Sequence, residues 1–391
     1  MKVAVVTGSR SEYGILRPVI EALLSDPFFQ VEVVATGSHL SAEFGMTVTH
    51  IEADGIEVRH RVEMLLSSDS GVGMAKSTGL GVIGFADTLA LIQPDWVLLL
   101  GDRYEIMAAA QASLMLGFPV AHIGGGDVTE GAIDDAMRHA ITKMSHLHFA
   151  THEDAARLIV QMGEDPARVH CVGNPGLDAI LGSPQVTLAE LRVAGYDVAA
   201  DDLLVSLHPE TLGDASGLRS TAALVRETTA ALEDFAPGSA VWLILPNADP
   251  QGRELGGALR RWADGKTWVH VFPSVPAPMF RGLMAHCRAM VGNSSAALAE
   301  APSLGLPAVN IGSRQGGRLA GPSVIHAPMS APAIACAIRQ AMSSKGQPFV
   351  NPYGDGKSSR RIADVLKAAQ PARDWLRKCF QRMDVTKGRS C

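Results

Sequence analysis

The stretch MKVAVVTGSRSEYG, residues 1–14, decides the fold class. Residues 3–7 form a continuous apolar and β-branched run, which predicts a strand buried on both faces of a parallel sheet. Gly8 begins a tight turn, and a helical segment follows it. A strand, a turn and a helix in this order are the opening half of a βαβ unit, which predicts an α/β fold.

The same alternation of short apolar runs and helical segments continues along the chain. Three more runs in the first half predict parallel strands: 31–36, 96–100 and 120–123. Five runs in the second half do the same: 203–207, 241–245, 269–271, 289–291 and 308–311. Helical segments such as 105–116 and 218–235 separate these runs, and LGSPQVT at 181–187 predicts a linker. We therefore expect two Rossmann-like domains with parallel sheets that face a central cleft.

The composition excludes several classes of protein. A length of 391 residues suits two domains, and an apolar share of 47% suffices for a sizeable core. The 34 basic and 40 acidic residues give a net charge of −6, so we expect no nucleic-acid partner, which would require a basic face. Five scattered cysteines without a CxxC pair indicate neither a disulfide framework nor a zinc site.

The absence of targeting signals predicts a cytoplasmic protein without a membrane partner. No signal peptide precedes the first strand. The apolar stretch at 80–100 is interrupted by Asp87 and by residues 93–95, so no run is expected to approach the ~18 residues that span a bilayer. The segment 372–391 has six Lys or Arg against two Asp, which favours a solvated tail.

Polar residues follow the predicted strands of the first half, where ligands bind in open α/β sheets. Arg10 lies beside a helix start, which suits an anion such as a diphosphate; the alternative is an arginine that caps a turn. His39 follows the second strand, where a lone histidine is more often structural. Asp102 lies in the loop that follows the strand at 96–100, where partial burial can raise the pKa of a carboxyl toward that of a base. The alternative for Asp102 is an N-cap of the helix at 105–116.

The densest group of chemically active residues is GGGDVTEGAIDDAMRHAITK, residues 124–143. Its three glycines let the backbone approach a ligand closely. Asp134 and Arg138 are four residues apart and share one helical face, beside Asp135 and His139. The alternative for Asp134 and Arg138 is a surface salt bridge, but the density of carboxylates, histidine and glycine indicates a functional segment.

The polar residues of the second half suit a phosphate. His208 directly follows the strand at 203–207. Ser294 and Ser295 open a predicted helix, where hydroxyls and backbone amides together form a phosphate cradle. Glu300 lies about a turn and a half further on, within reach of a ribose diol.

Three segments indicate which kind of anion or nucleotide the protein binds. NIGSRQGGR at 310–318 presents Arg314 and Arg318, which suit an anion. GVGMAKST at 71–78 contains a lysine without the preceding glycine that a P-loop requires. The first strand is not followed by GxGxxG, so no nicotinamide cofactor is indicated.

These motifs, in this order, resemble the hydrolysing UDP-N-acetylglucosamine 2-epimerases of sialic and legionaminic acid synthesis. The matching runs span roughly residues 1–365: GSRSEYG, ATGSHL, GDRYE, DVTEGAIDDAMRHAITKMSHLHF, MGEDPARV, HPET, NSS, EAPSLG and NIGSRQGGR. NPYGDGKSSRRI at 351–362 also resembles the non-hydrolysing bacterial UDP-N-acetylglucosamine 2-epimerases. The AIDDAMRHAITKMSH block and the RQGGR loop are specific, whereas a motif such as HPET alone is weak.

The resemblance implies a GT-B-like fold whose C-terminal helix packs back on the first domain. The expected limits are 1–180 for the N-terminal domain, 188–360 for the C-terminal, UDP-binding domain, and 361–391 for the C-terminal helix and tail. It also implies a homodimer that binds a UDP-sugar and needs no metal, flavin or nicotinamide.

Roles for individual residues follow from the resemblance alone. The diphosphate would be bound by Arg10, Ser294 and Ser295, helped by His208 and Arg318, with Arg314 in the same loop. Glu300 would bind the ribose. Asp102, Asp134 and Arg138 would line the sugar side, with His39 nearby.

One departure concerns the acid and base. Many relatives have HIEGGE where this chain has HIGGGD at 122–127, so the first glutamate is replaced by Gly124 and the second by Asp127. The change leaves the acid/base assignment open among Asp102, Asp127 and Asp134, and it is consistent with a bulkier sugar.

The expected reaction converts UDP-N-acetylglucosamine, or a related UDP-2-acetamido sugar, to UDP and a free N-acetylmannosamine-type sugar. The alternatives are a 2,4-diacetamido-2,4,6-trideoxy sugar carried on UDP or GDP, and a non-hydrolysing 2-epimerase. A GT-B glycosyltransferase and a sugar-nucleotide sensor without activity are further rivals.

Overall fold

The structure is a computed structural model, and it describes residues 1–66, 70–129, 133–209, 218–235, 238–246, 250–370 and 372–382. The chain divides into unit 1, Met1–Gly182 with Tyr353–Cys391, and unit 2, Ser183–Pro352. The first division falls inside the linker expected at 181–187. The second comes earlier than the expected limit at 360, because the chain from Tyr353 onward pairs with unit 1: the Asn174 N–H donates to the Tyr353 carbonyl at 2.7 Å.

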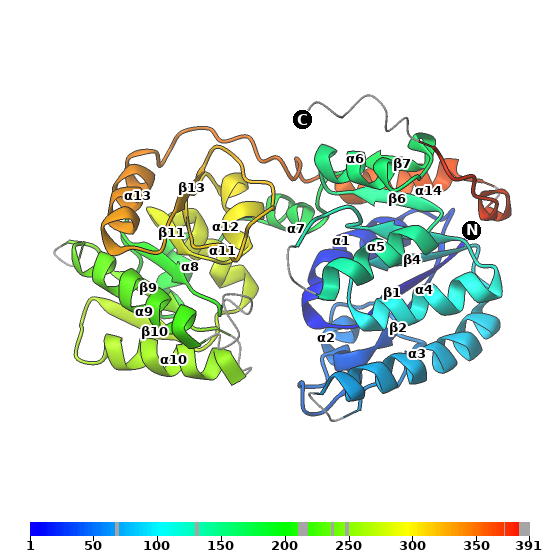
Figure 1. Ribbon diagram of the computed structural model, residues 1–391, viewed down its shortest axis with the longest axis horizontal. Coiled ribbons are helices and arrows are strands. Elements are labelled where there is room, and N and C mark those ends of the chain that lie inside the picture. The colour runs from blue at the N-terminus through cyan, green and yellow to red at the C-terminus, as the bar shows by residue number, and fades with distance from the viewer. Residues whose placement is uncertain are drawn as a thin grey trace. The chain divides into compact units, whose positions relative to one another are not determined.

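Unit 1 contains a parallel sheet of seven strands (Figure 1). The strands are β1 (Lys2–Thr7), β2 (Gln30–Thr36), β3 (His60–Val62), β4 (Trp96–Leu100), β5 (Val120–Ile123), β6 (Leu147–Ala150) and β7 (Val169–Cys171). Their order in the sheet is β3-β2-β1-β4-β5-β6-β7. The runs expected at 96–100 and 120–123 are β4 and β5, and the two earlier ones begin one residue sooner than expected.

Helices cover both faces of this sheet, as the doubly wound pattern requires. They are α1 (Arg10–Ser25), α2 (Val48–Ala53), α3 (Gly71–Ile92), α4 (Tyr104–Leu116), α5 (Ile133–Met144), α6 (Glu153–Gln161), α7 (Gly176–Gly182) and α14 (Ser358–Ala368). Short 3-10 turns lie at η1 (Gly37–Leu40), η2 (Pro166–Arg168) and η4 (Ala372–Leu376).

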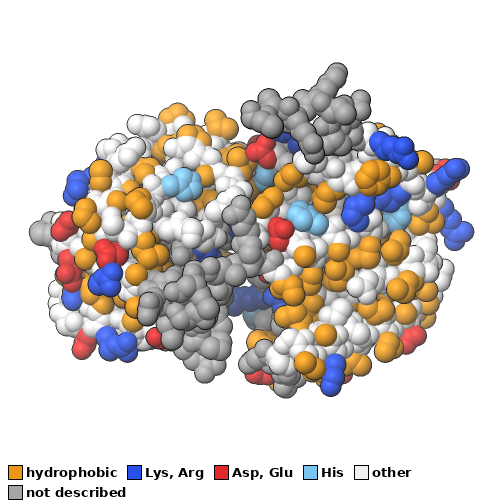
Figure 2. All heavy atoms as spheres, in the orientation of Figure 1, with side chains coloured by type: hydrophobic (Ala, Val, Ile, Leu, Met, Phe, Trp, Pro, Cys, Tyr) orange, Lys and Arg blue, Asp and Glu red, His pale blue; other side chains and the backbone are white. Residues whose placement is uncertain are grey.

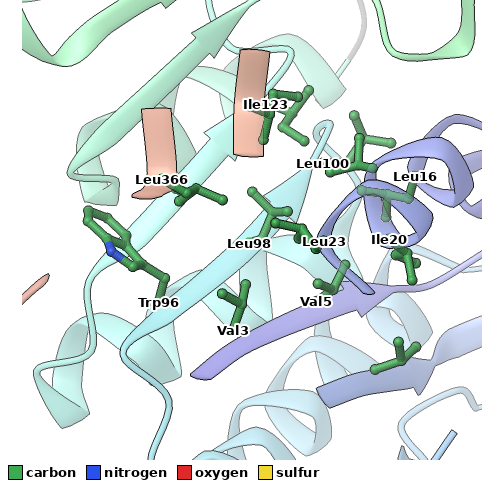
Figure 3. Packing of buried hydrophobic residues seen from close by; sticks show 14 of the residues in the cluster. Val3, Val5, Leu16, Ile20, Leu23, Trp96, Leu98, Leu100, Ile123 and Leu366 are labelled. Atoms are coloured by element: carbon green, nitrogen blue, oxygen red, sulfur yellow. The ribbon is translucent and has the colours of Figure 1, made fainter. Parts of the chain in front are cut away.

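The core of unit 1 contains side chains from both the N-terminal and the C-terminal parts of the chain. Figure 3 shows Val5 and Leu98 of the sheet packed with Leu16 of α1 and Leu366 of α14, and all four side chains are fully buried. The carboxylate of Asp178 accepts the backbone N–H groups of Ser358 and Ser359, at 3.0 and 2.6 Å, and so binds the N-terminus of α14. The C-terminal helix is thus part of the first core.

Unit 2 repeats the architecture with six parallel strands. They are β8 (Leu203–Ser206), β9 (Val241–Ile244), β10 (Val269–Phe272), β11 (Ala289–Gly292), β12 (Ala308–Ile311) and β13 (Val324–Ala327), in the order β10-β9-β8-β11-β12-β13. The helices are α8 (Leu188–Val193), α9 (Leu218–Glu233), α10 (Pro250–Ala263), α11 (Ala277–His286), α12 (Ala296–Ala299) and α13 (Ala331–Ser343), with a 3-10 turn at η3 (Ala301–Leu304). Both domains are therefore α/β with parallel sheets, as expected.

Helix α3 differs from what the sequence analysis expected. In the part of the chain that the structure describes, α3 alone is long and apolar enough to cross a membrane by length and composition, with a mean hydropathy of 1.2. The helix begins at Gly71, well before the stretch at 80–100, and its 22 residues include only two charged ones, Lys76 and Asp87. One face packs in the core through Phe85 and Leu89, so α3 is a core helix of unit 1.

The segment 372–382 is docked on unit 1, and the expectation of a solvated tail is wrong for this part. The guanidinium of Arg168 donates to the carbonyls of Trp375 and Arg377 at 2.7 and 2.9 Å, and the Trp375 ring packs against Trp96. Lys378 forms a 2.7 Å ion pair with buried Glu164. Aromatic burial and a specific buried partner therefore outweigh the basic composition; residues 383–391 lie outside the described residues.

Each sheet changes its winding direction at one point, and ligands bind at such points in open α/β sheets. In unit 1 the point lies between β1 and β4, and in unit 2 it lies between β8 and β11. The loops that follow these four strands contain Arg10, Asp102, His208 and Ser294. The sequence motifs therefore lie where the fold would bind a ligand.

Candidate functional site

The candidate site residues of unit 1 are organised by Arg138 of α5. Its side chain is only 5% exposed, although it is charged. The guanidinium forms an ion pair with Asp102, donates to the Asp127 carbonyl at 2.7 Å and to Thr129 Oγ1 at 3.1 Å, and contacts Asp135 Oδ1 at 3.3 Å. A buried cation with this many acceptors fixes the loops after β4 and β5 relative to each other. Arg138 is therefore no surface salt bridge.

Asp102 lies two residues beyond β4, after a turn at Gly101 with φ +80°. The turn is supported by His122, whose Nε2 donates to the Gly101 carbonyl at 2.7 Å. Burial lowers the pKa of His122 to about 3, so this ring stays neutral. Helix α4 has Arg103 at its N-cap position without a side-chain cap, so Asp102 caps no helix. Its carboxylate instead faces Arg138 and remains 23% exposed.

Asp127 and Asp134 provide two more carboxyl groups beside this pair. Asp127 Oδ1 accepts a 2.7 Å hydrogen bond from His152 Nε2 and is one-third exposed. Burial and the nearby Asp102 charge raise the pKa of Asp134, so it binds a proton more readily than an exposed aspartate. The expected pairing of Asp134 with Arg138 is replaced by contacts of Arg138 with Asp102 and Asp135. The expected acidic cluster is thus brought together, with different partners.

His39 is buried within unit 1 and is not exposed at the candidate site. The ring is fully buried in η1, with Nε2 3.0 Å from Thr7 Oγ1 and Nδ1 2.8 Å from Thr47 Oγ1. Burial lowers the pKa of His39 to about 4. Both ring nitrogens are therefore used to join the end of β1 to the segment before α2.

Arg10 is the first residue of α1, and its side chain is exposed. Ser9 provides the N-cap of this helix, so the turn does not depend on Arg10. Within the described residues the Arg10 guanidinium forms no ion pair. It is thus available to an anion at the helix N-terminus.

Two buried glutamates close to Arg10 and Asp102 were missed. Glu12 accepts the Gly8 N–H at 2.7 Å, and burial raises the pKa of its carboxyl to about 7. Glu105 is fully buried and binds Arg103 at 3.0 Å. A Cβ on Gly37 would come within 2.9 Å of the Glu105 side chain, so a glycine is needed there. Glu12 lies on the apolar face of α1, which is the signal that could have found it.

The candidate residues of unit 2 are organised by Asn293, which the sequence analysis also missed. Its side chain is fully buried; Oδ1 accepts the His208 N–H at 2.7 Å, and Nδ2 donates to the His208 carbonyl at 2.9 Å. The Asn293 carbonyl accepts hydrogen bonds of 2.9 Å from Arg314 and from Gln315. Asn293 thereby joins the loops that follow β8, β11 and β12.

Gly292 makes this joining possible. It has φ +147°, and a Cβ would lie 1.9 Å from the Ser206 carbonyl, so only glycine lets β8 and β11 end this close together. The signal was the glycine and asparagine of GNSS, which precede the serines that the sequence analysis chose.

The remaining predicted residues of unit 2 lie around these joined loops. Ser294 is buried and its Oγ accepts the Ala296 N–H at 3.3 Å, whereas Ser295 is exposed at the start of α12. Glu300 ends α12, and burial raises the pKa of its carboxyl. Arg318 is half-buried and its N–H donates to the Gln315 carbonyl at 3.2 Å. The predicted hydroxyls and arginines of unit 2 thus lie in the segments that follow β11 and β12.

No metal site is evident in the described part of the chain: it contains no group of three or more His, Cys, Asp and Glu side chains that could hold a metal ion.

The sequence is similar to several curated proteins. It is 33% identical over 379 residues to a UDP-N,N'-diacetylbacillosamine 2-epimerase (hydrolyzing) of Legionella pneumophila, covering 97% of this chain and 98% of that protein. It is 32% identical over 326 residues to a GDP/UDP-N,N'-diacetylbacillosamine 2-epimerase (hydrolyzing) of Campylobacter jejuni, covering 83% of each. It is also 32% identical over 371 residues to a UDP-N-acetylglucosamine 2-epimerase of Neisseria meningitidis, covering 93% of this chain and 94% of that protein.

Solved structures share the fold. The UDP-GlcNAc 2-epimerase from Neisseria meningitidis, bound to UDP-GlcNAc, superposes with a TM-score of 0.80 at 22% identity, covering 94% of this chain and all of that one. A UDP-N-acetylglucosamine 2-epimerase structure from Listeria monocytogenes gives 0.76 at 20% identity, covering 98% and 99%. Both agree with the expected GT-B-like architecture.

The family model for UDP-N-acetylglucosamine 2-epimerase matches residues 21–367, which include nearly all of the loops described above. With this match over most of its length, and relatives above 30% identity, the chain belongs to the UDP-N-acetylglucosamine 2-epimerase family.

Proposed function

We propose that this chain is a hydrolysing 2-epimerase that converts a UDP-linked 2-acetamido sugar to UDP and the free 2-epimeric sugar. The observation that carries the proposal is the group of Asp102, Asp127 and Asp134 around buried Arg138. Three carboxyl groups at the end of a parallel sheet supply acid and base chemistry, while the unit 2 loops supply cations and hydroxyls for a diphosphate. The relatives named as hydrolyzing support the outcome.

The first step in this proposal is an elimination. Asp102, oriented by Arg138, takes the proton from C2 of the sugar, the C1–O bond to UDP breaks, and a C1–C2 double bond forms. The charge that grows on the departing diphosphate is stabilised by cations such as Arg10 and Arg318 and by the hydroxyls of Ser294 and Ser295. Glu300 binds the ribose of the same nucleotide.

The second step is the addition of water across the double bond. The water oxygen joins C1, and a proton is delivered to C2 from the face opposite to the one that lost it, which gives the manno configuration. Asp134 suits the donor role because burial and the Asp102 charge raise its pKa above that of an exposed aspartate. Asp127, fixed by His152, suits the orientation of the water and accepts the proton that the water loses as its oxygen joins C1. In this proposal Arg314 and His208 contribute to the binding of the diphosphate, and Asn293 joins the two loops in which they lie.

The identity of the sugar is the finer part of the proposal. UDP-N-acetylglucosamine is our first candidate substrate. A 2,4-diacetamido-2,4,6-trideoxy sugar is the second, and Gly124 favours it: a Cβ at this position would meet no atom of the described residues within 4 Å, so these residues leave space there.

The test is incubation of the enzyme with UDP-N-acetylglucosamine and with UDP- and GDP-linked 2,4-diacetamido-2,4,6-trideoxy sugars, followed by NMR. We expect UDP and a free manno-configured sugar from one UDP substrate without any acceptor. Dialysis against EDTA should leave the rate unchanged, because the proposed steps need no metal. A UDP-linked epimer as product would indicate a non-hydrolysing enzyme, dependence on an acceptor a glycosyltransferase, and an intact substrate a sensor; each would contradict the proposal.

A further inference from the structure

One lysine of the docked segment, residues 372–382, differs from the basic side chains around it. Figure 2 shows Lys and Arg side chains gathered over the side of unit 1 where β7 and α14 lie in Figure 1. Arg373, Arg377 and Arg382 are exposed, as solvated cations are expected to be. The side chain of Lys378 is only 23% exposed, and a cation that leaves water to this extent requires specific acceptors.

The ammonium group of Lys378 has three such acceptors. It donates to the carbonyls of Lys143, at 2.9 Å, and of Ser145, and it forms the 2.7 Å ion pair with Glu164. An ammonium group has three N–H donors, so these contacts use all of them. The two carbonyls lie at the C-terminal end of α5, where the last carbonyls of a helix lack partners within it and a nearby cation is favourable.

The next residues of the docked segment bind the C-terminal end of α6. The Gln381 N–H donates to the Gly163 carbonyl at 2.9 Å, two residues beyond this helix. The Phe380 ring packs directly on Gly163, where a Cβ would lie 2.4 Å from the ring, so the contact requires glycine. Lys143 of α5 connects the two helix ends, because its ammonium group donates to the Met162 carbonyl at 3.1 Å and lies 4.9 Å from the centre of the Phe380 ring.

The N-terminal parts of the same two helices hold candidate site residues. Helix α5 carries Asp134 in its first turn and Arg138 five residues before Lys143. His152 is the N-cap of α6, and its ring fixes Asp127 through the 2.7 Å hydrogen bond. A helix rises only 1.5 Å per residue and moves as one body over so short a length. Contacts at the C-terminal ends of α5 and α6 therefore set the positions of the groups at their other ends.

We propose that the docked segment positions α5 and α6 for the reaction, with Lys378 as its principal positioning residue. The role rests on the proposed function, since it concerns the placement of the acid and base groups of that reaction. A displacement of about 1 Å far from the chemistry can lower a rate by about 10²-fold. The match to the family model ends at residue 367, so it does not include the docked segment.

The first test compares turnover and UDP affinity in matched variants of the full chain. Lys378→Met should lower kcat by about tenfold or more and leave UDP affinity unchanged, because UDP is expected to bind mainly to unit 2. Arg382→Met removes an exposed charge of the same segment and should keep the parent kcat. Ile362→Val removes a methyl group from the core beneath α14, so it lowers the stability of unit 1 without changing the docked segment; it should also keep the parent kcat.

Hydrogen exchange, followed by mass spectrometry, locates the effect without any substrate. In Lys378→Met the backbone amides of α5 and α6 should exchange faster than in the parent, while those of α1 and of unit 2 keep the parent rates. Phe380→Ala provides a second variant, because this side chain is 69% exposed and its removal should not prevent folding. It should give the same pattern of exchange with a smaller loss of kcat.

Three results would overturn the proposal. One is a parent kcat in both Lys378→Met and Phe380→Ala. Another is an equal loss of kcat in Ile362→Val, since lower stability alone would then explain the loss. The third is unchanged exchange of α5 and α6 in both docked-segment variants. A parent protein without turnover on any nucleotide sugar would contradict the proposed function, whereas faster exchange confined to α5 and α6 would still show that the docked segment positions them.

Discussion

At the scale of single residues, several candidate site residues share one feature, a position just after a parallel strand. Asp102 could be selected because it follows five buried residues, and the same rule selected Arg10 and His208. The partners of Asp102 could not be found this way, because Arg138 reaches it across 36 residues through the packing of α5. Glu12 could have been found from its place on the apolar face of α1, among Tyr13, Leu16 and Val19, but not from a position directly after a strand.

The first residue-scale prediction concerns Asp102. Asp102→Asn should keep the fold and the affinity for UDP, because the change is nearly isosteric and UDP is expected to bind mainly to unit 2. Turnover should fall by about 10²–10⁴-fold, since an amide cannot accept the C2 proton. Calorimetry with UDP and a UDP-release assay measure the two properties. Turnover near the parent rate would transfer the role of base to Asp127, to Asp134 or to Glu130, which lies outside the described residues.

The second residue-scale prediction concerns the buried carboxyl of Glu12. Its pKa is about 7 in the folded chain against an ordinary value of 4.5, so the folded state binds a proton that the unfolded state has lost. The free energy of unfolding should therefore fall as the pH rises from about 4.5 to 7, by on the order of 3 kcal/mol from this group. Glu12→Gln removes this contribution.

Urea unfolding of the parent and of Glu12→Gln at several pH values measures the effect. As the pH rises to 8, the free energy of unfolding of Glu12→Gln should increase relative to that of the parent. Parallel pH profiles for the two proteins would show that Glu12 titrates normally.

At the scale of elements, continuous apolar runs predicted most of the strands, whereas β3, β6, β7 and β13 were missed. β3, β7 and β13 lie at the edges of the two sheets and β6 lies beside β7, and all four have only three or four residues. These segments are strands because they pair with adjacent strands in the folded sheet. A single sequence does not reveal which segments will be adjacent. The same limit applies to Asn293, whose function as a joint depends on three loops that meet only in the folded unit.

The element-scale prediction tests this joint. Asn293→Ala removes the side-chain bonds to the backbone of His208 and should loosen the loops after β8 and β11. UDP affinity should fall by about tenfold or more, since the loss of buried hydrogen bonds costs about 1–3 kcal/mol. The rise in melting temperature that saturating UDP produces should shrink in the same variant. Asp102→Asn serves as the matched control, because it should leave UDP affinity unchanged; an unaltered affinity in Asn293→Ala would contradict the role of the joint.

At the scale of the whole molecule, composition misjudged the C-terminal segment. Its positive charge indicated a solvated tail, but one of its lysines, Lys378, forms an ion pair with the buried carboxylate of Glu164. Burial alone would raise the pKa of Glu164, yet hydrogen bonds from His148, Lys143 and Lys378 outweigh it and lower that pKa to about 2. Charge counting along a sequence cannot recognise such a site, because Glu164 and Lys378 are distant in the chain.

The whole-molecule prediction follows from this contact. Lys378→Met should lower the free energy of unfolding by about 1–3 kcal/mol, because buried Glu164 loses one of its charged donors. Arg382→Met, which removes an exposed charge from the same segment, should leave stability within about 0.5 kcal/mol of the parent. Equal stability of the two variants would mean that the docked segment contributes little to unit 1.

The central claim, elimination at C2 followed by addition of water, is tested most directly by carrying out the reaction in deuterated water. Proton NMR of the released sugar should show the manno configuration with deuterium at C2, and Asp102→Asn should release almost none of this product. A released sugar that keeps its original hydrogen at C2, or that keeps the gluco configuration, would contradict the account.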